Sequence, residues 1–180
     1  TYGDWSSDVC SSDLLVILAG VVCLLSSLVA VSLFHRARVT RGRSRMSWLA
    51  LAGAAVGCGI WATHFIAMLA YEPRVAVAYD IRLTVLSLIA AVLVTTAGLT
   101  YAVHRPTRWA APIGGAVVGA GVACMHYTGM WALQMPGYVT WSADLVTASV
   151  LLGLSLGAAA LAVAVRRDGL RGRSEEHTSE

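Results

Sequence analysis

Two histidines stand in apolar surroundings, each with a methionine four residues further along the chain. His64 and Met68 lie in the stretch WATHFIAML, and His126 and Met130 lie in CMHYTGM. If both stretches are helical, each imidazole lies beside a thioether on one helix face, because residues four apart share a face. Imidazole and thioether together suit copper, and thioether favours Cu(I), whereas zinc more often recruits thiolates, carboxylates or further histidines.

A purely structural role is the alternative for each of these residues. A lone imidazole among apolar side chains is more often a hydrogen-bonded core residue than a ligand, and methionine at helical spacing usually packs. Two histidines that occupy matching positions, each followed by a methionine one turn later, favour a shared site.

The elements that must position these side chains are membrane-spanning helices. Of the 180 residues, 57% are hydrophobic and 13% are charged, which is too apolar for an ordinary soluble domain. A helix needs about 20 apolar residues to cross the roughly 30 Å of hydrocarbon in a bilayer. We therefore predict an all-α integral membrane fold with five transmembrane helices, at residues 15–34, 48–70, 83–103, 109–133 and 145–165.

The second and fourth predicted helices are copies of one another. The stretch GAAVGCGIWATHFIAMLAY from Gly53 aligns without a gap with GAVVGAGVACMHYTGMWAL from Gly115. This indicates a duplicated two-helix unit whose copies run parallel, with glycines four apart that allow close helix packing. The paired positions are Gly53/Gly115, Ala54/Ala116, Val56/Val118, Gly57/Gly119, Gly59/Gly121, His64/His126 and Met68/Met130.

These stretches resemble the MHYT domain, a bacterial integral-membrane sensor module. MHYTGM at 125–130 and WATHFIAML at 61–69 carry the resemblance, together with RSRMSWLALAGAAVGCGIW and YDIRLTVLSLIAAV, so it spans most of residues 15–165. The resemblance implies three copies of a two-helix unit plus one helix, of which this chain would hold two copies. It also implies copper-dependent sensing of a diatomic gas such as oxygen, CO or NO, and fusion to a cytoplasmic cyclic-di-GMP synthesis or hydrolysis domain.

The resemblance also implies which residues bind the metal. Carried over position by position, it assigns copper ligation to His64, Met68, Met125, His126 and Met130. Thr63 stands where the motif usually has methionine, so the first copy lacks one thioether. Tyr127 either orients His126 or its ligand, or anchors the helix at the membrane interface.

Other classes of function fit the sequence less well. Two histidines on separate helices at similar depth could instead ligate a b-type haem in an electron-transfer subunit, although the small-residue helix face favours packing too close for a porphyrin. The sequence supports the interpretation as half of a transporter even less, because the repeated units run parallel rather than inverted. No constellation of catalytic residues and no phosphate-binding loop is visible, so we expect a signalling input module that is not itself an enzyme and binds no nucleic acid.

Arginine placement predicts the orientation. Arginines gather in three segments, around 36–45, at 105–108 and at 166–171, whereas the segments around 72–80 and 135–144 hold only Arg74. The positive-inside rule places the three arginine-bearing segments in the cytoplasm and the N-terminus outside. We expect a multi-pass protein of the bacterial inner membrane, with the lipid bilayer, a diatomic gas and a C-terminal cytoplasmic output domain as partners.

The two ends of the chain are expected to be foreign to this fold. Codons that fit SDVCSSDL near the start are the reverse complement of codons that fit RSEEHTS near the end, as in a DNA fragment flanked by one sequencing adapter. We therefore predict that residues 1–14 and 173–180 are adapter-derived and that the sensor domain occupies residues 15–172, without a third repeat.

Overall fold

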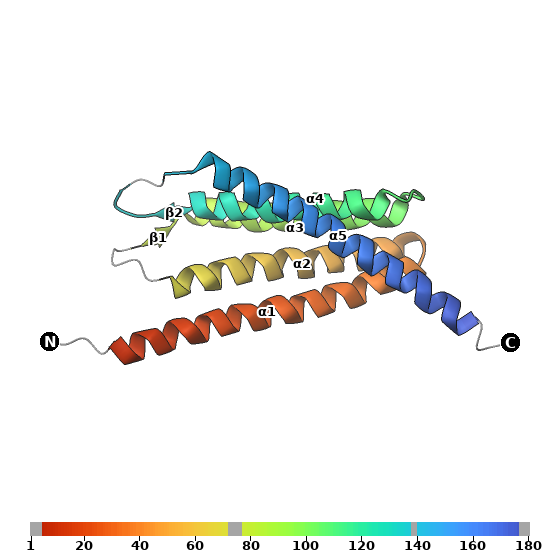
Figure 1. Cartoon of the computed structure of the whole chain (residues 1–180), viewed down its shortest axis with the longest axis horizontal. Helices are drawn as coiled ribbons and strands as arrows, with labels where there is room; N and C mark the ends of the chain where they lie inside the picture. Colours follow the sequence, from red (N-terminus) through yellow and green to blue (C-terminus); the bar gives the residue numbers. More distant parts are fainter. Residues whose placement is uncertain (1–4, 72–76, 138–139, 177–180) are drawn as a thin grey trace.

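The computed structural model describes residues 5–71, 77–137 and 140–176, and the side chains at 12–71, 77–137 and 140–166. Within these ranges the chain forms a bundle of five helices that run alternately up and down, as Figure 1 shows. The elements are α1 (Trp5–Val39), α2 (Gly42–Ala70), β1 (Ala78–Tyr79), α3 (Ile81–His104), α4 (Ala110–Trp131), β2 (Leu133–Gln134) and α5 (Ala143–Glu176).

All five predicted transmembrane helices are present in the described residues. The segments long and apolar enough to cross a membrane are Ser12–Val39, Gly42–Ala70, Ile81–His104, Ala110–Trp131 and Ala143–Arg166. The helices α1, α2 and α5 extend beyond the predicted spans, since helix continues into the charged residues that flank each apolar run. The chain is an all-α, multi-pass membrane protein.

The segment that carries the first group of arginines is mostly helical rather than a loop. Only Thr40 and Arg41 separate α1 from α2. The next residue, Gly42, has a φ of +64°, a conformation that suits glycine because it lacks a Cβ atom. The chain therefore reverses in a very short turn, and the arginines on either side lie on helix ends.

A two-residue antiparallel strand pair, not expected from the sequence, lies at the opposite end of the bundle. Ala78 pairs with Gln134, and Tyr79 pairs with Leu133. Asp80 continues this link: its backbone N–H donates to the Ala132 carbonyl at 2.8 Å, and its side chain accepts from the Leu83 N–H at 3.1 Å, which caps α3. The pair holds the start of α3 against the end of α4.

The first repeat unit, α2 and α3, packs through glycines. A Cβ atom placed on Gly53 would lie 2.7 Å from the Thr96 Cα, and one on Gly57 would lie 2.7 Å from the Val92 Cα. Both distances are shorter than side chains tolerate, so glycine lets the two backbones touch.

The second unit, α4 and α5, repeats these contacts. A Cβ atom on Gly115 would lie 2.9 Å from the Ala158 Cα, and one on Gly119 would lie 3.0 Å from the Leu154 Cα. These four residues are the repeat equivalents of those that meet in the first unit. The duplication read from the sequence is therefore a duplication of helix packing.

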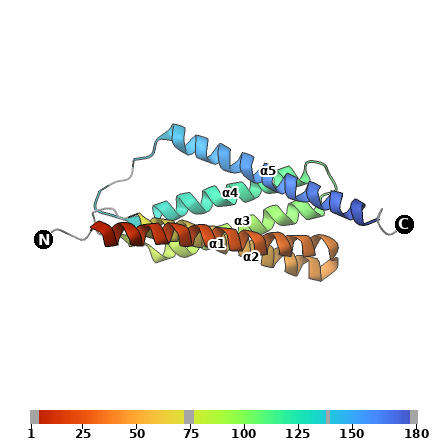
Figure 2. The same ribbon diagram turned by 60° about the horizontal axis from the view of Figure 1, so that its bottom comes forward.

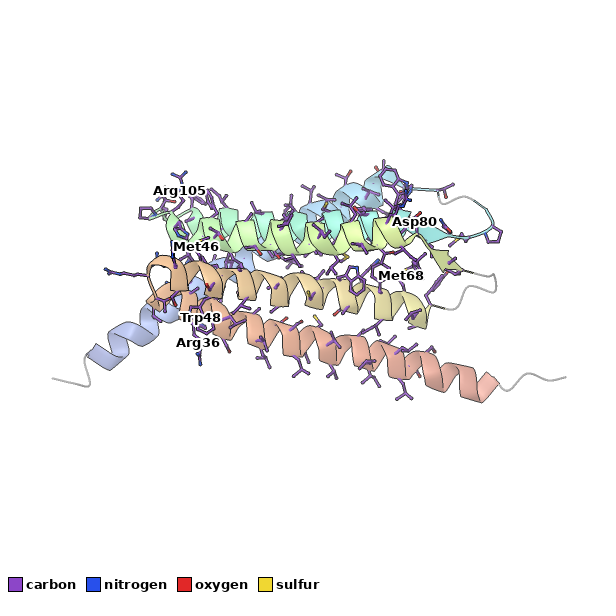
Figure 3. All side chains as sticks on the ribbon, turned by 180° about the vertical axis from the view of Figure 1, so that it is seen from behind. Arg36, Met46, Trp48, Met68, Asp80 and Arg105 are labelled. Carbon is purple, nitrogen blue, oxygen red and sulfur yellow. The ribbon has the colours of Figure 1, made fainter. Side chains whose placement is uncertain are left out.

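The two ends of the bundle differ in character. Figure 3 shows Arg36, Met46, Trp48 and Arg105 at one end, and Met68 and Asp80 at the other. In Figures 1 and 2, α5 crosses the other helices obliquely and reaches from the strand-pair end to the arginine-bearing end.

The predicted adapter-derived ends, residues 1–14 and 173–180, lie partly outside the described residues, as does the segment that holds Glu72 and Arg74. Residues 5–14 and 173–176 continue α1 and α5 as helix. The adapter origin of both ends stays a prediction.

Candidate metal site between α2 and α4

The structure brings the two repeated histidines into direct contact. The Nδ1 atom of His64 on α2 lies 3.4 Å from the Nδ1 atom of His126 on α4. Their ring centroids are 5.1 Å apart and the rings meet edge to face, at 80°. Because α2 and α4 both run from the arginine-bearing end toward the strand pair, equivalent positions reach the same depth, and the two repeated imidazoles meet.

Within the part of the chain that the structure describes, the second ring nitrogen of His64, Nε2, lacks the hydrogen bond that a buried polar atom normally makes. His64 Nε2 is buried and has no hydrogen-bond partner among the described residues. The ring lies against α4 at Gly129, where an added Cβ atom would be only 2.7 Å from Nε2, and the Phe65 ring covers it at 5.0 Å between centroids. A buried ring nitrogen without a partner is costly, so packing and hydrogen bonding among the described residues leave His64 unexplained.

The three methionines predicted as ligands occupy different environments. Met125 is only 1% exposed and lies between Gly121 and Gly129 on one face of α4, which turns toward α3 and α2. Met68 and Met130 are half-buried, each one turn beyond its histidine toward the strand pair. Metal ligation by Met68, Met125 and Met130, as by the two histidines, stays a prediction.

The residues around His64 and His126 limit which side chains could act as a third metal ligand. Within the described residues, no cluster of three or more histidine, cysteine or carboxylate side chains could hold a metal ion. Cys124, adjacent to Met125 in the chain, is exposed. Thr63, the repeat equivalent of Met125, donates to the Ala19 carbonyl of α1 at 3.5 Å and so is engaged with α1. Among soft donors, the methionine thioethers therefore stay the predicted ones.

An aromatic chain connects the histidines with α5. The Tyr127 ring meets the His126 ring edge to face at 5.1 Å between centroids, and the Trp141 ring meets Tyr127 at 5.4 Å. The Tyr127 hydroxyl shares a short hydrogen bond with the Ser149 hydroxyl on α5. Tyr127 thus contacts His126 directly, as one of the two sequence interpretations requires.

Sequence reasoning missed Ser149, because one serine in an apolar helix carries no spacing signal. It also missed the support on the α2 and α3 side, where the Trp61 indole donates to the Thr84 carbonyl at 3.3 Å. The Phe65 ring packs edge to face on Tyr79 in β1, at 5.5 Å between centroids, and burial there raises the pKa of the Tyr79 phenol. This neutral aromatic layer closes the site toward the strand pair.

Comparison with known proteins identifies a repeat of the same kind. A family model described as the bacterial signalling protein N-terminal repeat matches twice, at residues 57–115 and 119–174. The two matches begin at Gly57 and Gly119, which the self-comparison of the sequence pairs with one another. No solved structure matches the chain.

Bacterial proteins that are similar to this chain include signalling proteins. An uncharacterized signaling protein of Caulobacter vibrioides is 37% identical over 163 residues, which is 88% of this chain and 20% of that protein. In Pseudomonas aeruginosa, the bifunctional diguanylate cyclase/cyclic di-GMP phosphodiesterase MucR is 35% identical over 89% of this chain and 24% of its own length, and the cyclic di-GMP phosphodiesterase NbdA is 35% identical over 82% and 19%. The chain thus spans about a fifth to a quarter of the length of these relatives.

Proposed function

Because the chain belongs to the MHYT family of bacterial signalling repeats, and is therefore a membrane-embedded signalling module rather than a catalytic domain, we propose that it senses a diatomic gas or redox state through copper. His64 and His126 would hold the metal, with thioether donors drawn from Met68, Met125 and Met130. Copper would supply a centre that binds a small gas molecule or changes oxidation state.

One observation carries this proposal, namely the 3.4 Å separation of the two Nδ1 atoms. Two nitrogens that each lie about 2.0–2.1 Å from one metal ion, at a tetrahedral angle, are roughly 3.3–3.4 Å apart. The same separation would serve a hydrogen bond between a protonated and an unprotonated nitrogen. The matching repeat positions of the two histidines favour the metal, since a simple hydrogen-bonded pair gives no reason for each to be followed by a methionine one turn later.

The contacts of His126 could transmit a change at the metal site to α5. A shift of its ring acts directly on Tyr127, and the Tyr127 hydroxyl is bonded to Ser149 on α5. Because α5 continues to the arginine-bearing end, we propose that two arrangements of this helix report the state of the site. Two relatives carry cyclic di-GMP enzymes in their names, so a cytoplasmic output domain of that class is the partner we propose for the full-length protein.

The alternative of a b-type haem is disfavoured by the same contact. Two axial imidazoles of a haem approach the iron from opposite sides and enclose a porphyrin in a wide apolar slot. Here the two rings touch edge to face, and glycines bring the neighbouring backbones together. A Soret band in the purified protein would decide for haem.

Copper content of the full-length protein tests the proposal. We expect elemental analysis to find copper in the wild type and much less in His64→Ala and in His126→Ala, because one remaining imidazole leaves the ligand set incomplete. Met130→Ala should have a weaker effect, since a thioether is held less tightly. The control is His104→Ala, an exposed histidine at the other end of the bundle whose ring nitrogen meets the Thr100 carbonyl. Equal copper per folded chain in all variants would end the metal hypothesis.

A further inference from the structure

A cavity of about 630 Å³ opens at the arginine-bearing end of the bundle. We call it the arginine cavity. Its described lining brings together side chains from α1, α2, α5 and the turn between α3 and α4. Among them are five arginines, namely Arg38, Arg45, Arg105, Arg108 and Arg166.

Contacts with neighbouring groups orient several of these arginines. The Arg45 Nε donates to the Thr40 carbonyl at 2.8 Å, and the Arg38 Nη1 donates to the Val165 carbonyl of α5 at 3.4 Å. The guanidinium of Arg105 lies 5.9 Å from the Tyr101 ring centroid, and that of Arg108 lies 5.4 Å from the Trp109 ring centroid. For Arg45, Arg105 and Arg108, these carbonyl and ring contacts position the cation without neutralising its charge.

The acids among the described side chains lie away from this cavity. No carboxylate belongs to the described lining. Asp80 lies at the opposite end in Figure 3, where Asp144, in the first turn of α5, also lies. The topology rule accounts for arginines on one side of the membrane, but it does not require them to converge on one cavity. Convergent guanidinium groups are suited to a phosphate, which they bind with paired hydrogen bonds.

A second hollow, of about 220 Å³, lies deeper in the bundle. Its lining includes Phe34, one helical turn before Arg38 on α1, and Leu161, one turn before Val165 on α5. The other lining residues are almost all apolar: Ala30, Val31, Val56, Leu99, Val118, Ala160 and Ala164. A charged cavity at the helix ends is therefore followed, along α1 and α5, by an apolar groove at the depth of the membrane interior.

We propose that the two hollows bind one anionic phospholipid, with its phosphate among Arg105, Arg108 and their neighbours and an acyl chain in the apolar groove. Basic pockets between transmembrane helices bind such headgroups in other membrane proteins. A soluble phosphate would use the arginines but would leave the groove beneath them unexplained. The lipid would bridge α5 to α1 and α3, and so affect the position of α5, which leads to the C-terminus.

Lipid titration of the purified chain in detergent tests this. Phosphatidylglycerol, phosphatidylcholine and inorganic phosphate are the probes, and native mass spectrometry counts the lipid bound per chain. We expect one phosphatidylglycerol that binds more tightly than phosphatidylcholine and is not displaced by inorganic phosphate. The double variant Arg105→Gln/Arg108→Gln should weaken it about 30-fold, because two guanidinium groups that bind the phosphate directly are lost.

A matched control removes the same charge outside the cavity. Arg41 and Arg43 are exposed at the same end and do not line either hollow, so Arg41→Gln/Arg43→Gln should change the affinity by less than about two-fold. Equal weakening in both double variants would reduce the effect to surface charge and overturn the proposal. Displacement by inorganic phosphate, or equal binding of phosphatidylcholine, would overturn it as well.

The groove has its own test, which holds even if the cavity variant folds poorly. Ala160→Phe fills the groove and leaves every charge in place, whereas Ala159→Phe adds the same ring to an exposed position of α5 outside the lining. We expect the first to lose phosphatidylglycerol and the second to keep it, at equal helicity by circular dichroism. Retention of the lipid in both would contradict an acyl chain in the groove.

Discussion

His64 differs from the other polar side chains described within the bundle. Thr95 is fully buried, and its hydroxyl lies 3.0 Å from the Gly53 carbonyl of α2 and 2.7 Å from the Ala91 carbonyl of its own helix. In a membrane, such backbone carbonyls are the usual partners of hydroxyl groups. His64 Nε2 has none among the described residues, although it is buried. An unsatisfied polar group in apolar surroundings is costly, so His64 is the described side chain that packing explains least.

A substitution at Gly129 tests the position of the His64 ring while both histidines stay in place. An alanine there would place its Cβ 2.7 Å from His64 Nε2 and 3.1 Å from Cδ2, and since both atoms belong to a side chain, the imidazole rather than α2 must move. We expect Gly129→Ala to weaken copper binding about 10-fold, the effect typical of disturbed ligand orientation. Copper titration and thermal unfolding of the full-length protein measure both consequences.

The control for this variant is Gly20→Ala, since an added Cβ on Gly20 meets nothing within 4 Å. Copper affinity in Gly129→Ala as high as in Gly20→Ala would show that His64 need not hold its position for binding. That result would mean that the copper is not held by His64 and would contradict the proposed ligand set.

At the scale of the elements, features that depend on long sequence patterns, such as membrane spans and repeats, could be predicted. Five apolar runs of membrane length and a gapless duplication were enough to predict the spans and the pairing of His64 with His126. The strand pair at Ala78–Tyr79 and Leu133–Gln134 was not predictable, because two residues carry no alternation. The meeting of Arg38, Arg105 and Arg166 at one cavity was equally hidden, since it depends on how α1, α3 and α5 pack against each other.

The repeated glycine contacts predict equal behaviour of the two units. A Cβ on Gly57 would lie 2.7 Å from the backbone nitrogen and Cα of Val92, and one on Gly119 would lie 2.7 Å from the Gly153 carbonyl carbon. Backbone atoms yield less than side chains, so Gly57→Ala and Gly119→Ala should each destabilise the bundle by about 1–3 kcal/mol. Reversible unfolding in mixed micelles measures this, with Gly20→Ala as the neutral reference. If either variant is as stable as that reference, the close helix contact in its unit is wrong.

Over the whole molecule, the histidine pair and the arginine cavity lie at opposite ends, and α5 lines the cavity and reaches the histidine pair through Tyr127. Ser149 meets Tyr127 near the histidines, and the Val165 carbonyl accepts from Arg38 at the cavity. A helix held at both ends can carry a change at the sensor site across the membrane as a rigid body. The copper site and the lipid site would then act on the same helix from opposite sides of the bilayer.

This arrangement requires the arginine-bearing end to face the cytoplasm, which the positive-inside rule predicts. Ser44 at the start of α2 and Thr140 before α5 are exposed residues at opposite ends of the bundle and suit cysteine substitution. In a chain whose native cysteines are replaced, a membrane-impermeant maleimide applied to intact spheroplasts should label Thr140→Cys at once. It should label Ser44→Cys only after the membrane is permeabilised, because that end carries the clustered arginines. Labelling of Ser44→Cys alone in intact spheroplasts would invert the orientation and place the histidine pair near the cytoplasmic face, where it would meet gas and copper from inside the cell.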